Sequence, residues 1–268
     1  MRGGRPRTAD SSKPTLIGGP SAATCLVEVD VASMRVAEIL SVVLTESPSG
    51  VDLPAGLVRL CAQTLPVTGV GLALMTEEGP AGTVAVTDGT ALQLEELQFS
   101  LGEGPCVEAS RTGRPVLQPD LARTAPARWP AFAAGAETAG LVAVFAFPLR
   151  VGGIRLGVLD LYRTTAGVLS AEELADALSF ADAATALLLH LQAQAAGWDL
   201  PAASLTLFDD RAEVHQATGI VSVQSAVSLH EAMLLLRARA YAEQRPIGEL
   251  ALDVLNGVID FGDDPDGQ

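Results

Sequence analysis

Cysteine and histidine are scarce in this chain of 268 residues, and neither is spaced for metal binding or cross-linking. The three cysteines lie far apart, which predicts reduced thiols and neither a disulfide framework nor a zinc site. Each of the three histidines stands alone on an expected helix, with no second ligand at metal spacing. We therefore predict no metal site. These residues are Cys25, Cys61, Cys106, His190, His215 and His230.

The sequence patterns of common catalytic sites are missing as well. No GxSxG string marks a nucleophile elbow. The GEGP at residues 102–105 lacks the later Gly, Lys and Ser or Thr that complete a phosphate-binding loop. No set of nucleophile, acid and base is recognisable. The sequence therefore predicts a protein that is not an enzyme and has no catalytic residues.

Long apolar runs are also lacking. The longest candidates, 141–147 and 183–191, are shorter than the ~20 residues that a membrane-spanning helix needs. The N-terminal segment is rich in Gly, Pro and Ser and lacks the apolar block and cleavage pattern of a secretory signal, so we expect a disordered tail over 1–28. A cytoplasmic protein without a membrane partner is the prediction.

Positive charge is in deficit. Lys and Arg number 17 against 32 Asp and Glu, which gives a net charge of −15. Because indiscriminate nucleic-acid binding depends on neutralising phosphates with Lys and Arg, this balance argues against it, and any such binding has to be local. The length and the 49% share of hydrophobic residues leave room for two domains with soluble cores.

Helices and strands alternate between about residues 51 and 195. The clearest signal is a pair of β-rich runs, 141–149 and 154–162, joined by a Gly-Gly turn, which predicts a hairpin. Ser170 and Glu173 are spaced to cap the start of a long helix. The remaining expected elements are a helix at 57–65, strands at 70–75, 83–87 and 116–118, and helices from 90 and at 129–138.

This order of elements, with the strings LGEGPC, RPV, FPL and GVLDLY, resembles a GAF domain of the kind fused to ANTAR domains in actinobacterial regulators. The resemblance implies a central antiparallel sheet with helices on one face and, on the other, a pocket beneath a loop-and-helix lid. In GAF domains such pockets hold cyclic nucleotides, tetrapyrroles or other small molecules, or serve only as dimerisation platforms. The motifs do not choose among these, so the cofactor is unknown.

Four residues are candidates to line that pocket: Cys106, Glu108, Asp120 and Trp129. Cys106 follows Gly104 and Pro105 at an expected helix start, where backbone amides and the helix dipole can lower a thiol pKa and create a reactive thiolate. The alternative, which we favour, is a small inert residue buried under the lid. The acids could hold a cationic ligand group or simply keep the surface solvated.

The C-terminal stretch 215–255 predicts three short helices around one small core. Ser228 and Glu231 have the spacing of a capping box, as do Asp210 and Glu213, and Pro246 ends the second helix. Within that second helix the expected inward residues are Ala232, Leu235, Leu236 and Tyr241, the arginines expected to reach solvent are Arg237 and Arg239, and the inward residues of the third helix are Leu250, Val254 and Ile259.

Small residues and a Leu-Arg pair give this stretch a resemblance to the ANTAR family over roughly 209–260. The residues that carry it are Ala217, Thr218, Gly219, Ala232, Leu236, Arg237 and Ala240. The resemblance implies an RNA-binding transcription antiterminator. In such proteins a pair of ANTAR domains holds the tandem stem-loops of a nascent transcript, and this prevents a terminator hairpin from forming.

Six residues are candidates for RNA contact: Thr218, Gly219, Arg237, Arg239, Tyr241 and Arg245. A few arginines beside Tyr241 can suffice, since recognition of RNA loops depends on stacking and base-edge hydrogen bonds. Two of the six have open alternatives. Arg237 could lay its aliphatic stem over apolar surface, and Gly219, which costs ~1 kcal/mol against Ala in a helix, could serve helix packing.

The expected fold class is α+β: a GAF-like antiparallel sheet flanked by helices, followed by a small all-α three-helix ANTAR domain. The expected boundaries are a tail at 1–28, a GAF-like sensor domain with flanking N- and C-terminal helices at 29–196, a linker at 197–208, the ANTAR domain at 209–260 and an acidic tail at 261–268.

The resemblances imply a regulator that acts by RNA binding and antitermination, with a GAF domain that senses a small molecule, redox state or partner. The apolar stripes of the helices at 31–44 and 170–194 favour a homodimer paired as a coiled coil, and burial within one GAF domain is their alternative use. The alternative function is a protein-interaction or dimerisation regulator without direct RNA binding.

Overall fold

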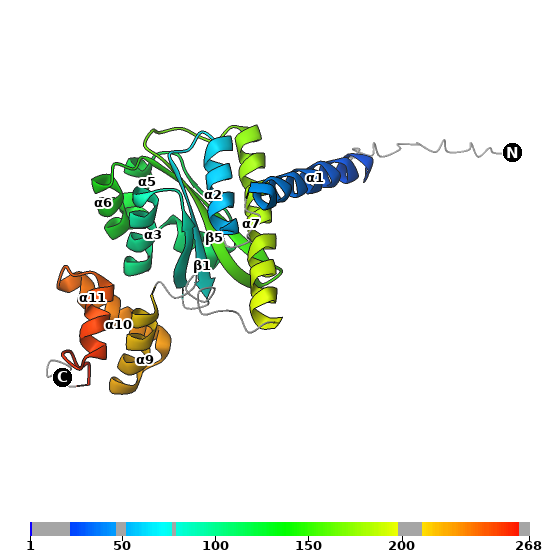
Figure 1. The fold of residues 1–268 in the computed structure, drawn as a ribbon. Coiled ribbons are helices and arrows are strands. Elements are labelled where there is room, and N and C mark those ends of the chain that lie inside the picture. The colour runs from blue at the N-terminus through cyan, green and yellow to red at the C-terminus, as the bar shows by residue number, and fades with distance from the viewer. Residues whose placement is uncertain (2–21, 47–51, 77–78, 198–210, 263–268) are drawn as a thin grey trace.

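The computed structural model describes Met1 and residues 22–46, 52–76, 79–197 and 211–262. Five antiparallel strands form one sheet in the order β2-β1-β5-β4-β3 (Figure 1). Their bounds are β1 (Gly69–Thr76), β2 (Gly79–Val86), β3 (Val116–Gln118), β4 (Ala143–Val151) and β5 (Ile154–Arg163). The predicted hairpin is confirmed: β4 pairs with β5 along their length, and Gly152 turns the chain with a φ of +60° that favours glycine.

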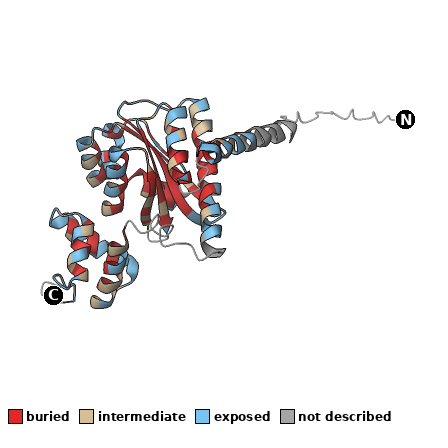
Figure 2. Cartoon of the chain, in the orientation of Figure 1, coloured by how far each residue is buried: buried red, intermediate tan, exposed pale blue. Residues whose placement is uncertain are grey.

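Each face of the sheet is covered by helices, and the buried residues lie between the layers (Figure 2). Helices α2 (Leu53–Thr64) and α7 (Ala171–Gly197) pack on one face, and α1 (Ala22–Glu46) packs on both of them. The second face carries α3 (Gly89–Leu101), α4 (Pro105–Thr112), α5 (Leu121–Arg128) and α6 (Pro130–Thr138). The prediction of an antiparallel sheet flanked by helices is confirmed.

The alternation of side chains along β5 divides the core in two. Leu159 and Leu161 point into the cluster beneath α2 and α7, whereas Val158 and Tyr162 belong to the cluster beneath α3 to α6. Since the strand is central and both of its faces are covered, every residue from 156 to 163 is buried. Asp160, which shares a face with Val158 and Tyr162, is therefore buried in the protein interior.

Several predicted boundaries change. Helix α1 begins at Ala22, inside the segment assigned to a tail, and helix α5 is not predicted from the sequence at all. The capping box of α7 is confirmed, because the amide of Ser170 donates to Glu173 and the amide of Glu173 donates to the Ser170 hydroxyl. Most of the expected linker, most of the acidic tail and Asp210 lie outside the described residues.

Helix α7 is longer than the sequence suggested. Among the described helices it alone is, without a break, long and apolar enough to cross a membrane, over Ala171–Gln194. It nevertheless contributes Phe180, Ala184 and Leu188 to the core beneath the sheet, as the central helix of a globular domain does. Its inner stripe is thus buried within one domain, which is the alternative that the sequence left open.

Three helices follow at the C-terminal end of the described chain: α9 (Ala212–Gln224), α10 (Leu229–Ala242) and α11 (Ile247–Leu255). They enclose a core of their own, and the predicted capping box of Ser228 and Glu231 is confirmed at the start of α10. Three inward or outward predictions are wrong. Leu235 and Tyr241 are exposed, with 66% of Tyr241 accessible, whereas Arg237 is only 8% exposed.

Candidate functional site

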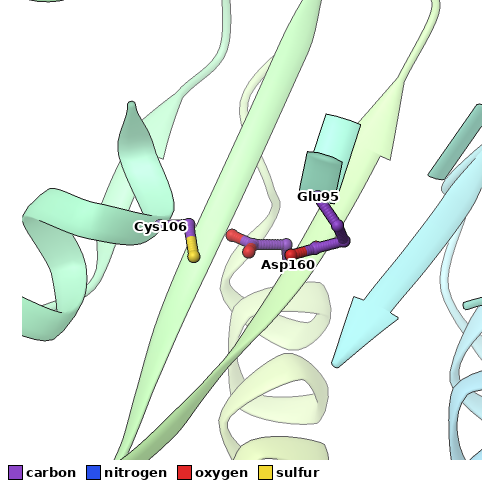
Figure 3. Close-up of side chains that lie close together, drawn as sticks. All are labelled: Glu95, Cys106 and Asp160. Atoms are coloured by element: carbon purple, nitrogen blue, oxygen red, sulfur yellow. The ribbon is translucent and has the colours of Figure 1, made fainter. Parts of the chain in front are cut away.

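A polar cluster lies buried between the sheet and helices α3 and α4. Glu95 from α3, Cys106 from α4 and Asp160 from β5 point toward one another (Figure 3). One carboxylate oxygen of each acid and the Cys106 sulfur all lie within 4.8 Å of one another. All three residues are buried, and Asp160 is 0% exposed. Two carboxyl groups and a thiol thus share a volume that the surrounding side chains close to water.

The pattern of α3 places Glu95 in this volume. The buried residues of the helix are Ala91, Leu94, Glu95, Gln98 and Phe99, a stripe at helical spacing in which two members are polar. Gly71 of β1 leaves room for the carboxyl group, because a Cβ at that position would overlap Glu95 Oε1. The Tyr162 hydroxyl donates a hydrogen bond of 2.6 Å to the same oxygen and fixes its position.

Gln98 connects the cluster to the start of α4. Its Oε1 accepts a hydrogen bond of 2.8 Å from the amide of Cys106. Three atoms of the cluster have no hydrogen-bond partner within the described part of the chain: the two carboxylate oxygens of Asp160 and the amide nitrogen of Gln98. Since nearly all buried polar atoms in folded proteins are satisfied, three such atoms in one cluster make it the candidate functional site.

Burial dominates the electrostatics of the cluster. It raises the pKa of Cys106 well above its ordinary value, and the nearby Asp160 and Glu95 carboxyl groups raise it further. Burial and then the Glu95 charge raise the pKa of Asp160, and burial raises that of Glu95 against the opposing hydrogen bond from Tyr162. On its own, Cys106 is therefore a buried thiol, as the favoured sequence interpretation held, and the helix N-terminus does not make it a thiolate.

The other three predicted pocket residues do not converge on this cluster. Glu108 pairs with Arg128, whose guanidinium lies 4.5 Å from the ring centroid of Trp129. Trp129 is buried and packs edge-on against Phe132. Asp120 is half-buried at the start of α5 and its side chain does not cap that helix. Of the four candidates, only Cys106 thus contributes to the cluster.

The resemblance implied a pocket beneath a loop-and-helix lid on this face of the sheet, and around the polar cluster side chains fill the space. Trp129, Phe132 and Tyr162 belong to the core cluster there. A cavity of about 580 Å³ lies on the same face of the sheet, between α5, α6 and the residues that precede β4. Its lining is mostly apolar and includes Leu121, Pro130 and Glu137, and no member of the polar cluster lines it.

Sequence reasoning missed Glu95, Gln98, Asp160 and Tyr162. The sequence did hold a signal for two of them. Asp160 lies inside an apolar strand and Glu95 lies on the apolar stripe of a helix, and both are positions at which apolar side chains are expected. The signal is weak without the fold, since Asp160 is buried only because helices cover the second face of the sheet.

The candidate RNA residues separate into two groups. Thr218 is buried, with its hydroxyl donating to the carbonyl of Val214, and Arg237 is buried as well. Gly219 is half-buried and faces open space, while Tyr241 is exposed. The remaining two, Arg239 and Arg245, are near the surface, and both guanidinium groups contact the single carboxylate of Glu243.

Arg237 is held by the sheet domain rather than by solvent. Its Nε donates a hydrogen bond of 3.0 Å to the carbonyl of Phe99 in the last turn of α3, and burial lowers its pKa to about 10, with the charge of Arg211 adding to the effect. Arg211 lies 3.8 Å from the Phe99 ring centroid and donates to Thr83 of β2. Phe99 itself belongs to the core of the C-terminal helices.

Comparison with solved structures shows similarity to several proteins, two of them GAF domains, and each match covers only part of this chain. The GAF domain of an Acinetobacter phosphoenolpyruvate-protein phosphotransferase is 13% identical, with a TM-score of 0.47, and the match covers 62% of this chain and 98% of that one. The corresponding GAF domain from Coxiella burnetii is 18% identical, with a TM-score of 0.45, and the match covers 61% of this chain and 98% of that one. A free methionine-R-sulfoxide reductase from Thermoplasma acidophilum is 17% identical, with a TM-score of 0.41, and the match covers 54% of this chain and 94% of that one.

No curated protein matches the chain. Residues 55–189, which span α2 to α7 and hold the whole polar cluster, match the GAF domain family. GAF domains are modules that sense small molecules or other signals, and half of the chain is accounted for by this match. The chain therefore belongs to the GAF domain family.

Proposed function

We propose that this protein is a non-enzymatic transcription regulator in which the GAF domain senses a small molecule, redox state or partner and the C-terminal helices, as an ANTAR-type domain, bind RNA hairpins. The observation that carries the RNA half is the shared carboxylate of Glu243. Its two oxygens are held by Arg239 at 2.8 Å and by Arg245 at 3.4 Å. Two guanidinium groups that meet at one anion form a place where a phosphate can replace that anion.

An exposed aromatic residue supports the same reading. Tyr241 lies between the two arginines in sequence and is 66% exposed, so its ring is free to stack on an unpaired base. The patch is small and local, which is what an acidic chain with a net charge of −15 requires for selective binding. A homodimer would present two such patches, one for each stem-loop of a tandem pair.

Exposed apolar side chains on the long helices favour that homodimer. Met34 and Leu44 of α1 and Leu178 and Leu189 of α7 are all exposed, while the inner stripes of the same helices are buried in the domain. Outward apolar residues on two packed helices provide a surface for a second copy of the chain. Sedimentation of the full chain would show a dimer, and a monomer at micromolar concentration would contradict this part of the proposal.

A second function is favoured by the acidity around the same arginines. Arg245 also pairs with Asp253 at 2.7 Å, so its charge is already neutralised within the chain. A surface of that kind can dock a protein partner and reject RNA. The alternative is therefore a regulator that does not bind RNA directly. It predicts that the unmodified protein binds no hairpin and that replacing Arg239 and Arg245 with Ala changes nothing in this assay.

Hairpin binding by the full chain distinguishes the RNA-binding regulator from the regulator that does not bind RNA. The double variant Arg239→Ala with Arg245→Ala removes both phosphate ligands, and we expect its affinity for a tandem hairpin at modest ionic strength to fall by at least about tenfold, since each charge-assisted contact contributes on the order of 1 kcal/mol. Glu243→Gln removes the competing carboxylate and should raise the affinity.

The matched control is Arg114→Ala with Arg155→Ala, which deletes two exposed arginines from the GAF domain. It changes the net charge by the same amount and should bind like the unmodified protein. Circular dichroism confirms that each variant is folded. If the unmodified dimer binds no hairpin, or if both double variants lose affinity equally, the specific RNA role is wrong.

A further inference from the structure

The buried polar cluster poses an energetic problem that the rest of the chain does not solve. Removing an ionised carboxylate from water costs several kcal/mol unless a partner compensates it. Tyr162 supplies one hydrogen bond to Glu95, and Arg211 acts on the cluster electrostatically. Asp160 has both oxygens buried without a hydrogen-bond partner among the described residues. Burial and the Glu95 charge raise the pKa of Asp160, so the compensation at this residue is supplied either by a proton or by a cation bound beside it.

The three side chains have the composition of a cation site. A thiol sulfur and two carboxylate oxygens come from three different elements, α3, α4 and β5, and their ligand atoms lie within 4.8 Å of one another. In a tetrahedral zinc site, metal–sulfur bonds of about 2.3 Å and metal–oxygen bonds of about 2.0–2.2 Å set ligand atoms roughly 3.5 Å apart. An inward movement of the side chains by about 1 Å closes that difference.

We propose that Glu95, Cys106 and Asp160 bind a divalent transition-metal ion of the zinc class. On binding, the Cys106 thiol loses its proton to solvent and the thiolate, with the two carboxylates, forms bonds to the ion. A thiolate ligand favours such an ion over Mg²⁺ or Ca²⁺, which take oxygen ligands alone. The inference deepens the sensor half of the proposed function and is independent of the RNA half.

Neighbouring groups already orient the proposed ligands. The Tyr162 hydroxyl donates to Glu95 and the Gln98 carbonyl oxygen fixes the first turn of the helix that carries Cys106. Such second contacts hold ligands in place and raise the affinity of metal sites. The unsatisfied amide nitrogen of Gln98 adds a free donor beside the thiol-bearing turn. A divalent ion would neutralise two of the three negative charges of the thiolate and the two carboxylates, and the cluster would keep one negative charge.

Metal content of the full chain tests the site directly. The protein, purified without chelators from cells supplied with zinc, should hold about one equivalent of zinc by elemental analysis. Loading with Co²⁺ instead should produce a thiolate-to-cobalt charge-transfer band. Cys106→Ser should abolish the band, and Asp160→Asn should lower bound metal at least about tenfold, because losing one ligand of three removes a large part of the binding energy.

The control is Cys61→Ser, which alters the other buried cysteine of the described chain on the opposite side of the sheet. It should keep both the metal and the band. Circular dichroism separates a lost ligand from a lost fold, and the cobalt band of the unmodified protein needs no variant at all. A metal-free protein after loading, or metal retained by both ligand variants, would overturn the proposal, whereas loss of hairpin binding alone would leave it intact.

Discussion

Arg237 places a guanidinium at the C-terminal end of α3, where the helix dipole favours a positive charge. Gly102, which ends that helix with a φ of +64°, leaves the space it needs, since a Cβ there would come within 2.7 Å of Arg237 Nη1. The pKa near 10 keeps the group charged at neutral pH. A residue that a helical pattern would place at the surface therefore serves as a contact between two parts of the chain.

Arg237→Ala is expected to destabilise that contact. The substitution removes a hydrogen bond to Phe99 and the packing of the aliphatic stem, for a loss of about 1–3 kcal/mol in the free energy of unfolding measured with urea. The matched change Arg239→Ala, two residues along, deletes a guanidinium with a surface ion pair and should cost at most about 1 kcal/mol. Equal losses in the two variants would show that Arg237 makes no specific contact.

Local signals of the chain predict whole elements well. The hairpin of β4 and β5 follows from alternation and a Gly turn, and two of the three predicted capping boxes, at Ser170 and at Ser228, lie within the described residues and are formed as the spacing indicates. These features depend on residues a few positions apart. The polar cluster and the burial of Arg237 depend on packing between α3 and distant segments, and no pattern within one element contains that information.

The capping box of α10 makes a prediction at the scale of this element. Hydrogen bonds from the Ser228 side chain and amide lower the pKa of Glu231 below its ordinary value. Ser228→Ala should cost about 0.5–2 kcal/mol of stability at neutral pH, as N-cap deletions do. Because the folded pKa of Glu231 is depressed, its contribution is present above about pH 4.5 and is lost as the pH falls through the folded value.

The difference between Ser228→Ala and the unmodified protein should therefore narrow in acid, as followed by urea unfolding at a series of pH values. Glu231→Gln keeps the geometry of the box without the titrating charge. When Ser228→Ala is introduced into the Glu231→Gln variant, the loss of stability that it causes should not vary with pH over the range in which Glu231 titrates. A Ser228→Ala effect that is constant from neutral to acid pH would mean that the carboxylate plays no part in the cap.

The two parts of the molecule meet at helix α3 and strand β2. Helix α3 carries Glu95 in the buried cluster and, one turn later, Phe99 in the core of the C-terminal helices. A group that binds at the cluster and shifts Glu95 shifts the same rigid helix against which Arg211 and Arg237 pack. The GAF domain thereby has a direct physical contact with the proposed RNA-binding helices.

Weakening this interface should release the C-terminal helices. Arg211→Ala with His215→Ala removes the contact with the Phe99 ring and Thr83, and the 2.9 Å hydrogen bond between His215 Nε2 and the carbonyl of Ala81. Amide hydrogen exchange should then rise in α9 to α11 and at the end of α3, while strands β4 and β5 stay protected. Hairpin affinity should rise several-fold as Arg237 becomes accessible.

His190→Ala, on the exposed side of α7, serves as the control and should change neither measurement. If exchange in α9 to α11 stays at the level of the unmodified protein, the contacts that Arg211 and His215 make with α3 and β2 do not hold these helices, and control through this interface is wrong.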